Sequence, residues 1–141
     1  MEPLSFATAP PRGPREQLAG IVYTARVIDK LRASLPGGEL NGYLALEGFS
    51  EMWQYYTGID LVELRDIVAR AATEDEVEAW IVERTAHVDR EKINGRMQRY
   101  DARRMPEDRR ERYDSVYPTE LRAQCPIIFD LLEADDERLY R

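Results

Sequence analysis

The stretch LAGIVYTARVIDKLRASL, residues 18–35, decides the fold that we predict for this chain. Its apolar side chains recur at steps of three and four residues, which places them on one side of an α-helix. These residues are Leu18, Ile21, Val22, Ala25, Ile28 and Leu35. Pro36-Gly37-Gly38 follows and ends the pattern. We therefore predict a central helix that begins near Pro14 or Arg15, tolerates Gly20, and packs against shorter helices.

The composition is that of one globular domain. The chain has 141 residues, of which 43% are apolar and 33% are charged. Its net charge of −7 argues against general binding to nucleic acid or to an anionic membrane surface. No apolar run is long enough to span a membrane, and the first residues do not form the apolar core of a secretory signal. We expect a cytoplasmic protein without membrane attachment.

Proline dominates the beginning of the chain. Four prolines and a glycine occur within residues 1–14, and proline removes backbone donors and fixes φ. We therefore predict that residues 1–14 form an extended arm and that residues 15–141 form a single helical domain.

Helix caps organise the middle of the chain. Ser50 is expected to cap a helix that ends at Gly58, Asp60 is expected to cap the next one, and Thr73 with Glu76 has the spacing of a capping box. Further helices are predicted from about Asp89 to Arg104, across the polar segment 106–117, from Pro118 to Cys125, and through the apolar cluster 127–132. The predicted fold is all-α: a compact single-domain bundle of about six or seven short helices.

Charge is segregated along the sequence. Residues 36–89 contain twelve acidic and three basic side chains, whereas residues 90–112 contain nine basic and five acidic ones. One interpretation is that the basic segment lies across the acidic helices of the same fold. The alternative is a basic patch for an anionic partner. In the predicted helix 90–104, Arg96, Arg99 and Arg103 lie on one side beside Tyr100, and these arginines are our candidates for contact with an anion or with nucleic acid.

Asp29 is the acidic residue most expected to be partly buried. Arg26 and Arg32 are each three residues away from it on the predicted helix, so the three side chains can form a chain of ion pairs. This chain is either a structural salt bridge between helices or a ligand-facing cluster that binds a carboxylate or phosphate. Tyr23 and Tyr55 complete the candidate ligand site. Tyr55 is included because the adjacent rings of Tyr55 and Tyr56 cannot both point inward, so one of them must face outward.

Several kinds of chemistry lack the residues that they require. The chain has one histidine, His87, and one cysteine, Cys125, so it cannot assemble a zinc site with the usual ligands or an internal disulfide. No glycine-rich phosphate loop and no nucleophile-elbow motif occur. We therefore expect no metal, no cofactor and no nucleophilic catalytic residue.

Several segments together resemble a small bacterial family that is described only as a domain of unknown function. The motif PR-x-x-L-x-G is matched by Pro14, Arg15, Leu18 and Gly20, and AR-x-I-D-K-x-R by Ala25, Arg26, Ile28, Asp29, Lys30 and Arg32. Thr57-Gly58, the TEDEVEAW segment and the ending IIFDLLEADDERL agree as well. Ala19 replaces a usual second glycine, and Tyr56 replaces a usual phenylalanine. The resemblance implies a compact helical domain and no particular activity.

For the function we consider three classes. The leading one is a non-enzymatic binding or scaffold module with a helical groove for a protein or a small anionic ligand, near Tyr23, Arg26, Asp29 and Tyr55. The first alternative is a small-molecule enzyme that uses Asp29 with Arg26 and Arg32. The second is nucleic-acid contact through the basic helix 90–104. The sequence does not identify the partner or the oligomeric state.

Overall fold

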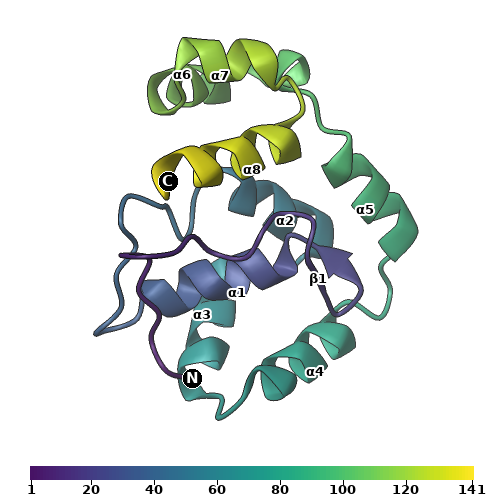
Figure 1. Cartoon of the computed structure of the whole chain (residues 1–141). Helices are drawn as coiled ribbons and strands as arrows, with labels where there is room; N and C mark the ends of the chain where they lie inside the picture. Colours follow the sequence, from purple (N-terminus) through teal and green to yellow (C-terminus); the bar gives the residue numbers. More distant parts are fainter.

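The computed structural model describes all 141 residues and is mostly helical, as predicted (Figure 1). It has eight α-helices, slightly more than the six or seven expected, together with one short 3₁₀ helix, η1, and one hairpin. The elements are β1 Gln17–Leu18, β2 Ile21–Val22, α1 Thr24–Ala33, α2 Phe49–Thr57, α3 Leu61–Arg70, α4 Glu74–Arg84, α5 Arg90–Gln98, η1 Ala102–Arg104, α6 Glu107–Val116, α7 Thr119–Gln124 and α8 Ile128–Leu139. No helix is both long and apolar enough to cross a lipid bilayer.

Helix α1 lies at the centre of the molecule. Nine of its ten residues are buried, because α8 lies on one side of it and α3 and α4 lie on the other (Figure 1). Val27, Ile28 and Leu31 are fully inaccessible and join the main apolar core. The same enclosure also buries three of the four charged residues of α1, Arg26, Asp29 and Lys30, whereas Arg32 stays partly exposed.

The predicted start of the central helix is wrong. Residues 17–22 form an antiparallel hairpin in which Leu18 pairs with Ile21, and α1 begins only at Thr24. Ala19 and Gly20, which connect the strands, have φ values of 56° and 74°. Two positive φ values are what a tight two-residue hairpin turn requires. The apolar spacing over residues 18–22 is helical, but two-residue strands are too short to show an alternation of their own, and the left-handed turn at Ala19 and Gly20 produces the hairpin.

The caps confirm most of the middle of the prediction. Asp60 accepts hydrogen bonds from the backbone at the start of α3, Thr73 does so for α4 and Asp89 for α5. Gly58 ends α2 with φ of 73°. Ser50, however, is not a cap: α2 begins at Phe49, and Ser50 is completely buried inside the fold.

The predicted basic helix 89–104 is interrupted. Helix α5 ends at Gln98, and Asp101 forms an antiparallel bridge with Ile127 at the start of α8. The N–H of Ala102 donates to the carbonyl of Pro126 at 2.7 Å. The chain leaves the helix here because its backbone bonds to the α8 entry instead of continuing the helical ladder.

The first fourteen residues contain no helix or strand of their own, and they lie against the domain. Phe6 is 2% exposed, and its N–H donates to the carbonyl of Glu39 at 2.9 Å. Leu4 donates to the carbonyl of Arg32 at the end of α1. These contacts make residues 1–14 a covering layer over one side of α1.

Candidate functional site

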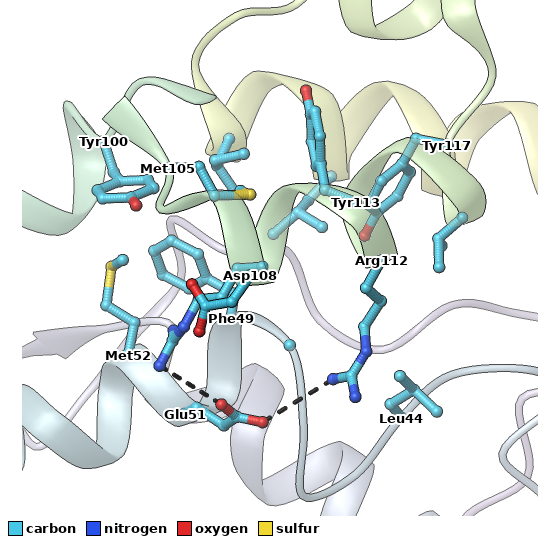
Figure 2. A pocket seen from close by; sticks show the side chains of 15 residues that line it. Leu44, Phe49, Glu51, Met52, Tyr100, Met105, Asp108, Arg112, Tyr113 and Tyr117 are labelled. Carbon is cyan, nitrogen blue, oxygen red and sulfur yellow. Dashed lines mark ion pairs between the residues drawn. The ribbon is translucent and has the colours of Figure 1, made fainter. Parts of the chain in front are cut away.

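Two neighbouring cavities open between α6, α8 and the loop of residues 40–48. The larger, which we call the aromatic pocket, has a volume of about 360 Å³, and Phe49, Met52, Tyr100, Met105, Tyr113 and Tyr117 supply most of its apolar wall (Figure 2). The smaller, which we call the polar pocket, has a volume of about 270 Å³ and is lined by Tyr23, Arg26, Lys30, Tyr43, Asp135 and Arg138, among others. Six lining residues are common to both, so the pockets adjoin: Leu44, Gly48, Phe49, Val116, Tyr117 and Leu132.

Helix α6 covers the aromatic pocket and is held to α2 by ion pairs. Glu51 of α2 lies 3.9 Å from Arg112 and 3.5 Å from Arg109 (Figure 2). Arg112 also lies 3.1 Å from Glu47, in the loop just before α2. Here basic side chains of residues 90–112 contact acidic side chains of residues 36–89. Part of the charge segregation is therefore compensated within the fold, as the first of the two interpretations expects.

Lys30 is the site residue that the sequence did not single out. Its side chain lines the polar pocket and is only 5% exposed, and its Nζ donates to the Tyr23 hydroxyl at 3.0 Å. No carboxylate forms an ion pair with it, although buried charges in proteins are generally paired. The sequence contains no signal for this role, because the lack of a carboxylate partner becomes visible only in the folded pocket.

Tyr23 lies where the hairpin joins α1, with a left-handed backbone. Its φ is 68°, a rare conformation for a bulky residue, and its N–H donates to the carbonyl of Pro14 at 2.8 Å. Its hydroxyl lies 3.5 Å from Ser50 Oγ and 3.0 Å from Lys30 Nζ. Burial opposes ionisation of the phenol, but the charges of Lys30 and Arg26 and the hydrogen bonds from Ser50 and Lys30 outweigh it. The pKa of Tyr23 therefore lies below its usual value.

Arg26 forms the strongest polar contact beside this pair. Its guanidinium donates two hydrogen bonds to Asp136 of α8, at 2.6 Å and 3.0 Å, and the Tyr43 hydroxyl donates to the same carboxylate at 2.7 Å. Burial disfavours the charge of Arg26, but Asp136 more than compensates, so the pKa of Arg26 is raised. At the rim, Arg138 pairs with Asp135 at 2.6 Å.

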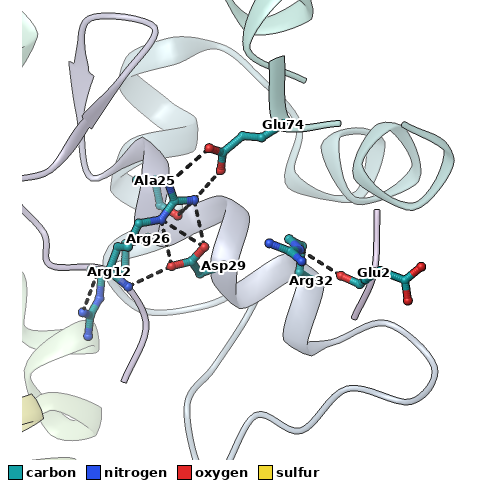
Figure 3. Close-up of polar contacts among 7 residues, drawn as sticks. All are labelled: Glu2, Arg12, Ala25, Arg26, Asp29, Arg32 and Glu74. Carbon is teal, nitrogen blue, oxygen red and sulfur yellow. Dashed lines mark hydrogen bonds and ion pairs between the residues drawn. The ribbon is translucent and has the colours of Figure 1, made fainter. Parts of the chain in front are cut away.

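The predicted ion-pair chain Arg26–Asp29–Arg32 does not form. Asp29 instead accepts hydrogen bonds from Arg12 of the N-terminal residues, from the main-chain N–H and from Nη2, each at 2.8 Å (Figure 3). The Arg12 guanidinium also contacts Glu74 of α4. The arginine that reaches Asp29 thus comes from outside the helix, because Arg26 is engaged by Asp136 on the other side of α1.

The remaining ligand candidates lie apart from the two pockets. Arg32 donates to the main-chain carbonyl of Glu2 at 2.8 Å (Figure 3). Tyr55 of α2 is 81% exposed. Neither Tyr55 nor Asp29 lines one of the two pockets. Of the five residues proposed as a ligand site, only Tyr23 and Arg26 are together at a cavity.

The three arginines proposed for anion contact do not share one helix. Arg96 is exposed on α5, Arg99 is exposed just after its end, and Arg103 belongs to η1. Arg103 pairs with Asp101 at 2.5 Å, and the hydrogen bond from Arg103 lowers the pKa of Asp101 to about 2. The single basic face predicted from helical spacing is therefore divided by the break after Gln98.

Comparison with known proteins identifies a family but no activity. A search of curated proteins finds no similar sequence. The model of one family, described as "Domain of unknown function (DUF5069)", matches residues 8–138. That span includes the N-terminal residue Arg12, the hairpin, both pockets and nearly all of α8. The chain therefore belongs to the DUF5069 family, in agreement with the resemblance read from its motifs.

Proposed function

We propose that this protein binds a small organic anion with an apolar body, in the two adjoining pockets between α6, α8 and the 40–48 loop. The anionic group is bound by Lys30 in the polar pocket, and the apolar body occupies the aromatic pocket. This is the binding-module class of function, with its site at Tyr23 and Arg26 and without Asp29, Arg32 or Tyr55.

The observation that carries the proposal is the charge balance of the polar pocket. Arg26 is neutralised by Asp136, and Arg138 is neutralised by Asp135. Lys30 alone has no carboxylate partner, and its one side-chain hydrogen bond leaves two of its three N–H donors free. An anionic ligand supplies acceptors for these free donors and places a negative charge beside Lys30.

The aromatic pocket supports the second half of the proposal. Ten of its fifteen lining residues are hydrophobic, and its volume of about 360 Å³ is within the range of small-molecule sites. Apolar walls with a few convergent polar groups at one end favour a molecule with a charged head and a hydrophobic body. A phenylalkanoate has this shape.

The test uses 4-phenylbutyrate and its neutral counterpart 4-phenylbutanol, with binding measured by NMR on ¹³C-methyl-labelled protein. We expect the carboxylate to shift methyl signals of Leu44, Val116 and Leu132 and to bind more tightly than the alcohol. Lys30→Met should weaken the carboxylate about tenfold or more, because a hydrogen bond to a charged group contributes roughly 1.5–3 kcal/mol.

Lys92→Met is the matched control, since Lys92 is an exposed residue of α5 outside both pockets. It should bind 4-phenylbutyrate like the wild type. Equal affinity for the acid and the alcohol, or equal loss in the Lys92 and Lys30 variants, would contradict the proposal. A carboxylate that shifts only signals remote from the two pockets would contradict it as well.

A further inference from the structure

The polar pocket contains an unusual pair of ionisable groups. Tyr23 and Lys30 both line it, 3.0 Å apart, and they are 1% and 5% exposed. If Lys30 is an ammonium and Tyr23 a phenol, the empty pocket retains one uncompensated positive charge. If Tyr23 is a phenolate, the pair becomes neutral. A phenolate 3.0 Å from the ammonium pairs a charge that would otherwise stand alone in a low-dielectric site, where an isolated charge has a large desolvation cost.

The surroundings of Tyr23 agree with ionisation of its phenol. On α1, Lys30 and Arg26 place positive charge near its oxygen, and on α2 the Ser50 hydroxyl is close enough to donate a hydrogen bond. The other charged groups around the pocket are already paired: Asp136 with Arg26, Asp135 with Arg138, and Glu47 with Arg112. The phenols Tyr43 and Tyr117 are neutral, and burial is the first cause that raises their pKa values. Tyr23 is the one phenol in this cluster whose pKa shifts downward.

We propose that Tyr23 and Lys30 form a proton-accepting site: the pair is phenolate and ammonium when the pocket is empty, and phenol and ammonium when an anion is bound. The pocket then binds an anion together with a proton. This inference rests on the proposed function of the same pocket.

Proton transfer to Tyr23 conserves the charge of the pocket. A weak acid, such as a carboxylic acid or a phenol, enters in its neutral form. Its O–H bond breaks, the electron pair stays on the ligand oxygen, and the proton forms a new O–H bond with Tyr23 Oη. The ligand is then an anion beside the Lys30 ammonium, and the total charge of the pocket is unchanged. A ligand that arrives already ionised requires uptake of a proton from solvent instead.

The free protein provides the first test, through ¹³C NMR of tyrosine labelled at Cζ, whose shift distinguishes phenol from phenolate. The chain has eight tyrosines, and the Tyr23 signal is the one missing from Tyr23→Phe. We expect this signal to show the phenolate at a pH below 10.0, the ordinary pKa of a tyrosine. Lys30→Met should return it to the phenol, and Lys92→Met should not. A Tyr23 signal that remains that of a phenol up to pH 10 would overturn the inference.

The second test measures proton uptake when 4-phenylbutyrate binds, by titration calorimetry in buffers of different ionisation enthalpy. At mildly alkaline pH the wild type should take up about one proton for each ligand bound, whereas Tyr23→Phe should take up clearly fewer protons for each ligand that it binds. Equal uptake by both proteins would contradict the role of Tyr23. Because the NMR test needs no ligand, it can fail while 4-phenylbutyrate still binds, so failure of the proton site is distinguishable from failure of the binding function.

Discussion

Arg12 holds Asp29 through its main chain and its side chain at once. The N–H of Arg12 and its Nη2 both lie 2.8 Å from carboxylate oxygens of Asp29, which is 5% exposed on the central helix α1. Arg12 also contacts Glu74 of α4, and its pKa is raised because Asp29 and Glu74 outweigh its partial burial. One side chain thus ties the N-terminal residues, α1 and α4 together.

Replacing Asp29 by alanine should destabilise the fold. The change removes three hydrogen bonds or more from Arg12 and leaves its main-chain N–H without an acceptor, which is expected to cost about 1–3 kcal/mol. Urea unfolding measures this free energy. Glu83→Ala, an exposed position on α4, is the control and should change stability by less than about 0.5 kcal/mol. Unchanged stability of Asp29→Ala would show that the contact with Arg12 is not structural.

Removing one partner of the buried Arg26–Asp136 pair should destabilise the fold more than removing both. Asp136→Leu leaves the guanidinium of Arg26, which is 2% exposed, without its counter-ion and is expected to cost about 3–5 kcal/mol. The double variant Arg26→Met/Asp136→Leu should recover much of that loss, because it removes both charges. A double-mutant cycle by urea unfolding measures the coupling. A double variant no more stable than Asp136→Leu would argue against charge burial as the cause.

Substitutions at the two adjacent turn residues of the hairpin should have opposite effects on stability. Ala19→Gly should stabilise the protein by about 0.5–1 kcal/mol, because alanine at φ of 56° carries a strain that glycine avoids. Gly20→Ala should destabilise it, since φ is 74° and the new Cβ would lie 3.1 Å from Cδ of Arg90. Thermal unfolding compares the two variants. Shifts of the same sign would contradict the assigned turn.

Alkaline pH should destabilise the protein through its buried phenols. Burial raises the pKa of both Tyr43 and Tyr117 in the folded state above the usual 10.0. The hydrogen bond to Asp136 raises the pKa of Tyr43 further. The folded protein therefore binds more protons than the unfolded chain above that pH, so stability is lost as the pH rises through 10. Urea unfolding at a series of pH values measures the slope, and Tyr43→Phe should make it shallower.

Ionisation of Tyr23 should make the protein more stable as the pH rises, in a pH range below that of the other buried phenols. Its folded-state pKa is below 10.0, so in the interval beneath that value the unfolded chain binds more protons and stability increases with pH. Lys30→Met removes the main charge that lowers the pKa, and the increase should disappear in that variant. The same pH series of urea unfolding curves provides the measurement.

Local signals explain what could be predicted from the sequence. The side chains of Asp60, Thr73 and Asp89 accept hydrogen bonds from backbone N–H groups no more than three residues away. Such local contacts can be predicted without knowing the fold. The hairpin was missed because Leu18, Ile21 and Val22 have helical spacing, and its two-residue strands are too short to show an alternation of their own. Family motifs identified the family without indicating where its residues point.

The site was less accessible because its contacts join distant parts of the chain. Arg26 meets Asp136 across 110 residues, and Arg12 reaches Asp29 from a proline-rich segment that has no periodic pattern. The sequence placed Arg26 correctly on the central helix, but Tyr23 precedes that helix and has a left-handed backbone. Nothing in the sequence favoured Lys30, because the absence of a counter-ion is a property of the assembled pocket alone.

Helix α1 belongs to the core and to the polar pocket at the same time. Val27, Ile28 and Leu31 stabilise the fold from the same ten residues that present Arg26 and Lys30 to the cavity. A redesign of ligand preference from this helix would therefore disturb folding as well. Leu44 and Val116 also line the pockets, but they are exposed and are not part of the buried core. They are therefore the positions at which the selectivity of the pocket can be engineered without disturbing folding.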